Sequence, residues 1–307
     1  MSLLSLLAVF LIEQLKPLDY RRIVGQPLVV WASFIESRFN AGAYQHGIAA
    51  WCLAVLPPVI LLAILYGLLY SISPILAWGL NVGVLYLTMG FRQFSHHYTE
   101  IQLALRFDDL PRARQLLAEW QGCSTSDLGT EDIARLSIEA ALAASHRHVF
   151  AVLLWFILLP GPCGALLYRL SAIIDRQWRQ QNTAEHNDFS IFSRQIFGII
   201  DWLPLRVTAA AFAIVGDFED AVYCWRTQAP LWPDRDLGIV LASGAGALGV
   251  QLGRPVVEDS EVADSAELGL GDPADVDFMQ SAVGLVWRAT VVWMLLLFLL
   301  GLASLVG

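Results

Sequence analysis

The sequence predicts an all-α protein: an integral membrane helical bundle with short or broken helices and a small cytoplasmic helical layer. Of its 307 residues, 56% are hydrophobic and only 15% are charged, whereas about 25% are charged in soluble domains. The apolar residues also gather in runs of bilayer length, since a helix needs about 20 residues to cross the hydrocarbon core. We therefore expect a single membrane domain over residues 1–307.

Four runs are apolar and long enough to be predicted as membrane spans: 48–70, 75–91, 149–168 and the C-terminal 285–306. The runs 2–12 and 237–252 are weaker candidates. A tight turn at 71–74 joins the first two spans into a hairpin, so the segments that flank this hairpin lie on the same side of the membrane. Both flanking segments carry several Lys or Arg residues, and the positive-inside rule therefore makes that side cytoplasmic.

The largest extramembrane piece is predicted at 92–148. Its apolar residues recur with helical spacing over 101–120, and a second helix is expected to start at 130–133 and continue through Leu142. Residues 255–277 are strongly acidic and are predicted to form a solvated loop. The net charge of −9 excludes a nucleic-acid partner, because phosphate binding needs a basic face.

The run 196–216 is of membrane length but contains Asp201, Pro204 and Arg206. Charged residues at membrane depth cost roughly 2.5–3.5 kcal/mol each on translocon scales, and chains that keep them usually use them. The spacing predicts a helix that begins near Asp201 as its N-cap, with Pro204 in the first turn. Such a helix is too short to cross. It either lines a protected cavity or begins at the membrane interface.

Two further patterns have alternative interpretations. Residues 244–249 match Gly-x-Gly-x-x-Gly, but no βαβ unit surrounds them, so close helix packing is the expected role rather than dinucleotide binding. His96 and Glu100 are four residues apart, so their side chains are expected on one face of a helix. They are interpreted either as solvated side chains at a helix end or as part of a site that binds a metal or shuttles protons. The pair at 146–148 is likewise expected at a solvated helix end, and no metal site is specified.

Five segments carry motifs in a recognisable order: 24–31 with Glu36, 133–139, 161–169 with Asp175, 202–206 and 245–253. Together they cover nearly the whole chain and resemble the CobD/CbiB superfamily of membrane proteins. The resemblance implies ATP-dependent ligation of adenosylcobyric acid to aminopropanol phosphate, with Mg-ATP and a corrinoid bound. Such chemistry uses acids for the metal and hydrogen-bond donors for the phosphates.

The chain departs from the synthase pattern after Glu139. Counted without gaps, the family's Glu and Asn fall on Ala143 and Ala144, and its Asp falls on Arg147. Another family acid is lost within 122–125. Asp201 stands where the synthases have Asn. These differences resemble the AmpE-like branch, which is implicated in signalling linked to cell-wall recycling and β-lactamase regulation.

We therefore expect a catalytically degenerate, AmpE-like sensor or regulatory protein, multi-pass in the bacterial inner membrane. Its partners would be the lipid bilayer and either a small-molecule ligand or another protein. The alternative is a working cobalamin-pathway ligase, and a transporter is a third class. The residues expected to line a polar cavity are Glu139, Arg169, Asp175, Asp201 and Arg206, with His96, His97 and Glu100 in a second tier.

Overall fold

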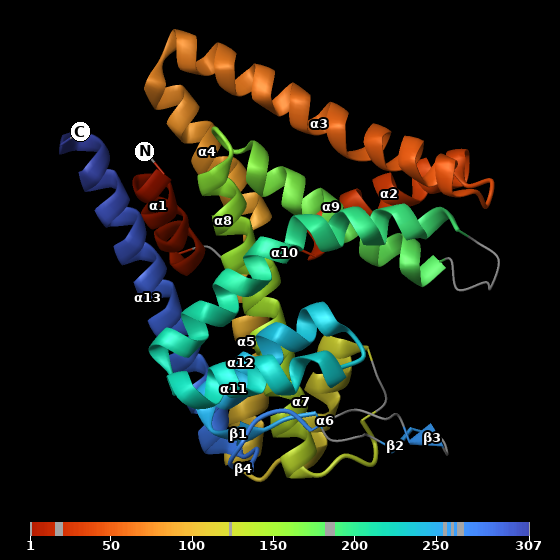
Figure 1. Cartoon of the computed structure of the whole chain (residues 1–307), viewed down its shortest axis with the longest axis vertical. Helices are drawn as coiled ribbons and strands as arrows, with labels where there is room; N and C mark the ends of the chain where they lie inside the picture. Colours follow the sequence, from red (N-terminus) through yellow and green to blue (C-terminus); the bar gives the residue numbers. More distant parts are fainter. Residues whose placement is uncertain are drawn as a thin grey trace. The chain divides into compact units, whose positions relative to one another are not determined.

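The computed structural model describes residues 2–15, 21–122, 125–181, 188–253, 257–258, 261–262 and 267–306. These residues are almost entirely helical (Figure 1), which confirms the all-α prediction. The chain divides into two compact units, residues 1–93 with 151–203 and residues 94–150 with 204–307. Each unit is described by itself.

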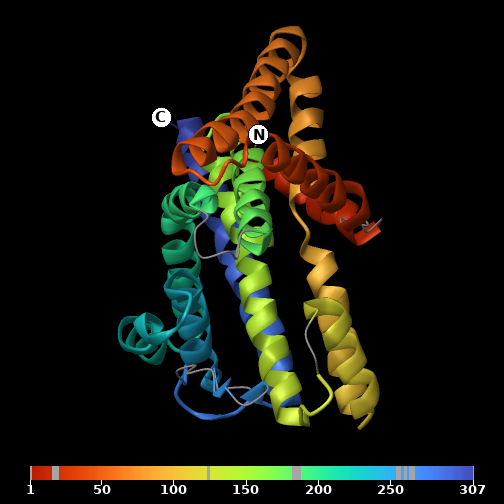
Figure 2. The ribbon, with the colours of Figure 1, turned by 90° about the vertical axis from the view of Figure 1, so that its right-hand side faces the viewer.

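The first unit is built from the N-terminal helices and from a group in the middle of the chain. Figures 1 and 2 both show α3 and α4 as a hairpin, which turns at Ser73. The elements of this unit are α1 (Ser2–Leu15), the π-helical turn η1 (Arg21–Gly25), α2 (Gln26–Phe39), α3 (Tyr44–Ile72), α4 (Pro74–Thr88), α8 (Ala151–Leu158), α9 (Cys163–Gln181) and residues 189–203 of α10 (Phe189–Val215).

The second unit contains the remaining helices and four two-residue strands. In it α13 packs beside α7 (Figure 2), and β1 pairs parallel with β4. Its elements are most of α5 (Phe91–Arg106), α6 (Leu110–Gln121), α7 (Thr130–Ser145), the π-helical turn η2 (His146–Phe150), residues 204–215 of α10, α11 (Phe218–Thr227), the 3₁₀ turn η3 (Ala229–Leu231), α12 (Arg235–Leu248), β1 (Val250–Gln251), β2 (Val257–Glu258), β3 (Glu261–Val262), β4 (Asp272–Pro273) and α13 (Val276–Val306).

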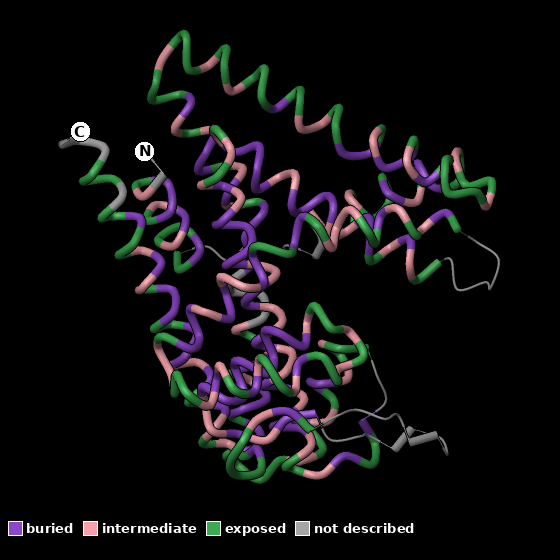
Figure 3. The backbone as a smooth tube through the Cα atoms, in the orientation of Figure 1, coloured by how far each residue is buried: buried purple, intermediate pink, exposed green. Residues whose placement is uncertain are grey.

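Four helical stretches are long and apolar enough to cross a membrane. They are Tyr44–Ile72, Thr130–Leu158, Phe189–Val215 and Val276–Ala303. The first and last contain most of the predicted spans 48–70 and 285–306. The predicted span 75–91 corresponds to the shorter helix α4. Figure 3 shows exposed residues along most of α3, and many of them, such as Leu61 and Leu68, are large and apolar, as lipid contact requires.

The predicted span 149–168 is wrong, because the chain leaves the helix after Leu158 and begins α9 at Cys163. Gly161 in this turn has φ +67°, a left-handed conformation that glycine adopts without steric penalty. Pro162 follows directly, and its fixed φ suits the entry to a helix. The apolar stretch instead extends upstream, so that residues 130–158 form the helical run.

The predicted helix start at Asp201 is also wrong. Helix α10 runs without a break from Phe189 to Val215 with Pro204 inside it. Since proline has no backbone N–H, the carbonyl of Ile200 loses the donor that residue i+4 normally supplies. The indole Nε1 of Trp155 donates to this carbonyl at 3.1 Å. A side chain from α8 therefore replaces the missing backbone bond.

The same arrangement occurs in α3, which contains Pro57 and Pro58. Pro58 removes the i+4 donor of the Ala54 carbonyl. Trp31 of α2 donates its indole N–H to that carbonyl at 3.2 Å. Helices α3 and α10, which have proline in their interior, thus each receive an indole hydrogen bond at a carbonyl that a proline has freed.

The single helix predicted over 101–120 is interrupted, whereas the predicted start at 130–133 is confirmed. The break is at 107–109, where Asp108 has φ 56° and Asp109 caps α6 by accepting the N–H of Arg112 at 3.1 Å. Further along, α7 begins at Thr130 and continues past Leu142. The predicted acidic loop 255–277 lies partly outside the described residues.

Residues 244–249 form the end of a helix, as expected, and the apolar run 237–252 is not among the long spans. A Cβ atom at Gly244 would lie 2.8 Å from the Leu142 side chain, and one at Gly246 would lie 2.5 Å from the carbonyl oxygen of Asp220. These glycines allow α12 to approach α7 and α11 closely. Their spacing therefore reflects helix packing.

Candidate functional site

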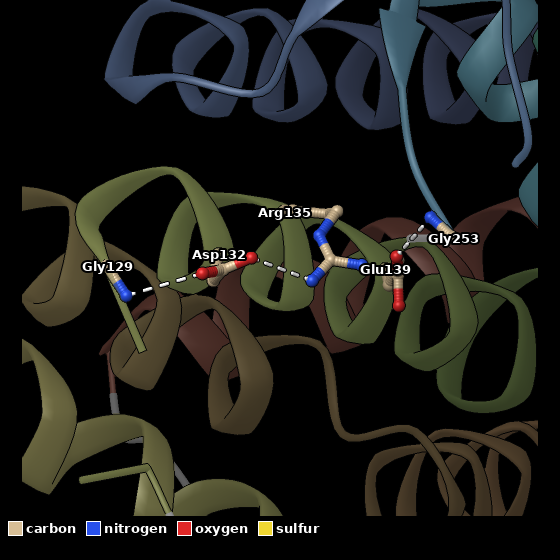
Figure 4. A network of polar contacts seen from close by, with 5 residues as sticks. All are labelled: Gly129, Asp132, Arg135, Glu139 and Gly253. Carbon is tan, nitrogen blue, oxygen red and sulfur yellow. Dashed lines mark hydrogen bonds and ion pairs between the residues drawn. The ribbon is translucent and has the colours of Figure 1, made fainter. Parts of the chain in front are cut away.

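The first polar group of the candidate site lies along one face of α7. Asp132, Arg135 and Glu139 are three and four residues apart, a spacing that aligns side chains on a helix. Asp132 accepts the backbone N–H of Gly129 at 3.3 Å and forms an ion pair with Arg135 at 2.9 Å. Figure 4 shows this row of side chains continuing to Glu139. The Arg135 side chain is only 3% exposed, so its charge lies inside the protein.

Glu139 connects this row to a distant segment. Its Oε1 accepts the backbone N–H of Gly253 at 2.8 Å (Figure 4). The position of Gly253 is set by the chain before it, because α12 ends at Gly249 in a left-handed conformation and Leu252 pairs with Leu268 through two backbone hydrogen bonds. Two motif segments, 133–139 and 245–253, therefore meet although more than a hundred residues separate them.

A buried histidine directly follows the last residue of α7. His146 begins the π-helical turn η2, and its Nδ1 is 3.0 Å from the hydroxyl of Thr208 on α10. Both side chains are fully buried. The expectation of solvated histidines at 146–148 is wrong for His146. Its apolar neighbours in the sequence were the signal that could have indicated burial.

The second polar group lies in the first unit, between α9 and α10. The Tyr168 hydroxyl donates to Oδ1 of Asp201 at 3.0 Å. Tyr168 is fully buried and Asp201 is 5% exposed. One residue further along α9, Arg169 is also buried. The contact pairs a buried tyrosine with a buried carboxylate, and the guanidinium of Arg169 is buried at the neighbouring position of α9.

The motif 161–169 positions Tyr168. Gly164 faces the carbonyl of Trp155, where a Cβ atom would collide with it. This lets α9 pack tightly against α8, and Tyr168 follows one turn later on the same face. The other end of α9 holds Asp175, which is buried and forms an ion pair with Arg179 at 2.7 Å.

The five expected cavity residues fall into both units. Arg169, Asp175 and Asp201 belong to the first unit, whereas Glu139 and the half-buried Arg206 belong to the second. All five are buried or half-buried, which charged side chains rarely are unless they are paired. Their grouping into one cavity stays a prediction.

The second-tier residues lie on α5 in the second unit. His96 Nε2 and Glu100 Oε1 are 3.4 Å apart, which confirms that they share a face, and His96 is largely exposed. The His97 ring instead stacks on Trp120, with centroids 6.3 Å apart. Among the residues that the structure describes, no three His, Cys, Asp or Glu side chains form a group that could hold a metal.

Sequence comparison relates the chain to one family over most of its length. The family model described as CobD/Cbib protein matches residues 22–286. A protein of Stutzerimonas stutzeri named cobalamin biosynthesis protein CobD is 38% identical over 89% of this chain and 90% of its own length. A protein of the same name from Chromobacterium violaceum is 34% identical over 80% of this chain and 73% of its own length. No solved structure matches the chain significantly.

These relatives correct the functional expectation. Their names place them in cobalamin biosynthesis, and nothing in the comparisons points to a degenerate AmpE-like sensor. The missing acid and amide side chains at Ala143 and Ala144 suggested that branch, but motif losses at one helix turn weigh less than identity spread over the whole chain. The matched residues and the level of identity are decisive: the chain belongs to the CobD/CbiB family.

Proposed function

We propose that the chain is an ATP-dependent amide ligase of cobalamin biosynthesis that joins adenosylcobyric acid to aminopropanol phosphate. The observation that carries this proposal is the 38% identity, over 89% of the chain, to a protein named cobalamin biosynthesis protein CobD. The retained motif segments support it, because they supply the buried charged residues of the two polar groups.

The reaction requires the corrinoid carboxylate to be activated by ATP and then attacked by the amine of aminopropanol phosphate. ATP gives up its terminal phosphoryl group, and phosphate leaves when the amide bond forms. Guanidinium groups bind phosphate oxygens in a bidentate manner, so Arg169 and Arg206 are suited to the phosphorylated substrates. Carboxylates such as Asp201 and Glu139 are suited to a metal or an ammonium group.

Mg²⁺ usually takes one or two protein carboxylates and completes its shell with phosphate oxygens and water. The buried Asp201 of the first unit and the half-buried Glu139 of the second unit are each a carboxylate that fits such a role. Bound Mg²⁺ would neutralise charge on the ATP phosphates. The role of the chain is to hold the carboxylates and arginines in place and to exclude water from them.

We place the protein in the bacterial inner membrane. Four helical stretches are suited to spanning, and both segments that flank the α3–α4 hairpin carry several Lys or Arg residues. The positive-inside rule assigns these segments to the cytoplasm, where ATP is available.

Complementation tests the proposed function. A Salmonella typhimurium strain that lacks its cobalamin biosynthesis protein CbiB should regain cobalamin-dependent growth on a medium that contains cobyric acid when it expresses this chain. The Stutzerimonas stutzeri relative and an empty vector serve as positive and negative controls. Membranes from the same cells should convert adenosylcobyric acid, aminopropanol phosphate and ATP into the amide, with ADP released in equal amount. Absence of both growth and product, with the chain present in the membrane and the positive control active, would overturn the proposal.

A further inference from the structure

The Tyr168–Asp201 hydrogen bond is placed where α10 departs from regular backbone bonding. Asp201 follows Ile200, whose carbonyl has lost its i+4 donor to Pro204 and accepts from Trp155 instead. The next residue then receives the Tyr168 hydroxyl at 3.0 Å. Two adjacent residues of α10 are therefore held by side chains from α8 and α9.

The tyrosine is enclosed on every described side. It is fully buried, and its ring lies 5.8 Å from that of Phe197, one turn before Asp201. A buried hydroxyl without an acceptor is unfavourable because its lost hydrogen bond to water is not replaced, and the Asp201 carboxylate is the acceptor here. The bond also restricts the rotation of the carboxylate, because Tyr168 itself has no room to move.

We propose that Tyr168 is a positioning residue for the ligation and acts by holding the Asp201 carboxylate in one orientation. This inference rests on the proposed function. The proposed function gives the Asp201 carboxylate to a metal or an ammonium group, and the hydrogen bond from Tyr168 fixes its orientation for that role.

The test compares four variants by steady-state ligase kinetics in membranes. Tyr168→Phe should lower kcat/KM about tenfold, the size expected for one buried hydrogen bond, with most of the loss in kcat. Asp201→Asn should lose activity at least as strongly as Tyr168→Phe, because its amide oxygen still accepts the hydrogen bond but the negative charge of the carboxylate is gone. Asp201→Leu should lose activity at least as strongly as Tyr168→Phe, and the double variant Tyr168→Phe/Asp201→Leu should be no worse than Asp201→Leu alone.

Tyr44→Phe is the matched control. Tyr44 lies in the same unit and its hydroxyl also donates to a side-chain oxygen, that of Gln195 at 2.9 Å, but on the exposed surface. Its loss should leave kcat and KM unchanged. A purely structural role for Tyr168 would reduce the amount of folded protein and its thermal midpoint while kcat and KM per molecule stayed normal.

The outcomes separate the two proposals. An inactive wild-type chain beside an active relative would overturn the proposed function. An active wild-type chain with a fully active Tyr168→Phe variant would overturn the positioning role and leave the function standing. A Tyr168→Phe loss that persists in full in the Asp201→Leu background would show that Tyr168 acts independently of Asp201, and would also overturn the inference.

Discussion

Replacing Trp155 with phenylalanine should destabilise the folded protein, because the Ile200 carbonyl loses the indole donor that stands in for the N–H missing at Pro204. A buried acceptor left without its donor costs about 1–3 kcal/mol. At roughly 2–4 °C per kcal/mol for a larger domain, the thermal midpoint should fall by about 2–12 °C. Detergent-purified protein can be heated with a fluorogenic maleimide, which reacts as the buried thiols of Cys163 and Cys224 become accessible.

A double-mutant cycle separates the hydrogen bond from lost packing. Pro204→Ala supplies a backbone N–H that can donate to Ile200, so the carbonyl no longer depends on the indole. Trp155→Phe should therefore cost less in the Pro204→Ala background than in the wild type, by about 1 kcal/mol. Packing losses of the smaller ring are present in both backgrounds and cancel.

The chain offers a second pair and its own controls. Trp31 and Pro58 have the same relation through the Ala54 carbonyl, so Trp31→Phe and Pro58→Ala should couple with the same sign. The crossed pairs, Trp155 with Pro58 and Trp31 with Pro204, share no carbonyl and should be additive. Zero coupling in both matched pairs, or equal coupling in the crossed ones, would refute the reasoning.

Three further predictions concern the second unit. Glu139→Met should lower stability by about 1–3 kcal/mol, since the backbone N–H of Gly253 loses its acceptor. Glu139→Gln keeps an oxygen at that place and should cost clearly less in the same thermal assay. Equal costs for the two variants would contradict the hydrogen bond. Gly246→Ala should destabilise the folded protein by about 1–3 kcal/mol through overpacking, because its Cβ would lie 2.5 Å from a backbone oxygen. Gly284→Ala, which has open space at its Cβ, should be neutral or stabilising. Melting curves recorded at equal protein concentration compare the two variants. Burial raises the pKa of the Cys224 thiol from 9.0 to about 11, with the nearby Asp220 adding to the shift. The folded state then holds its proton longer than the unfolded state, so this contribution to stability is present below about pH 9 and is lost as the pH rises toward 11; a Cys224→Ala variant should show a flatter stability curve over that range, and identical slopes would argue against the shift.

Local sequence signals predicted the class of the protein and many of its helices. The apolar run of α3 and the helix start at Thr130 follow from composition, spacing and first-turn acids, which act within a few residues. The small-residue spacing at Gly244 and Gly246 was correctly assigned to packing for the same reason. Helix interruptions at Gly161 and Asp108 were missed because apolar periodicity continues across them, and only backbone conformation breaks the helix.

The candidate site was predicted only as a set of residues. Asp201 stood out in the sequence as a charge within an apolar stretch, and Glu139 as part of the motif segment 133–139. Their partners did not, since Gly253 contributes a backbone N–H and Tyr168 looks like any core aromatic. Contacts between residues far apart in the chain depend on how helices pack, and one sequence contains no direct record of that packing.

Pro204 shows most clearly what each level determined. The sequence by itself determined that an apolar stretch of membrane length with charged residues inside it lies over 196–216, because apolar composition and charge are local properties. Whether a helix begins near Asp201 or runs through Pro204 was decided by tertiary structure alone. A proline interrupts a helix by leaving a carbonyl without a donor, and here Trp155, brought close by the packing of α8, donates to that carbonyl. The helix therefore continues through Pro204, and Asp201 lies in its interior beside Tyr168.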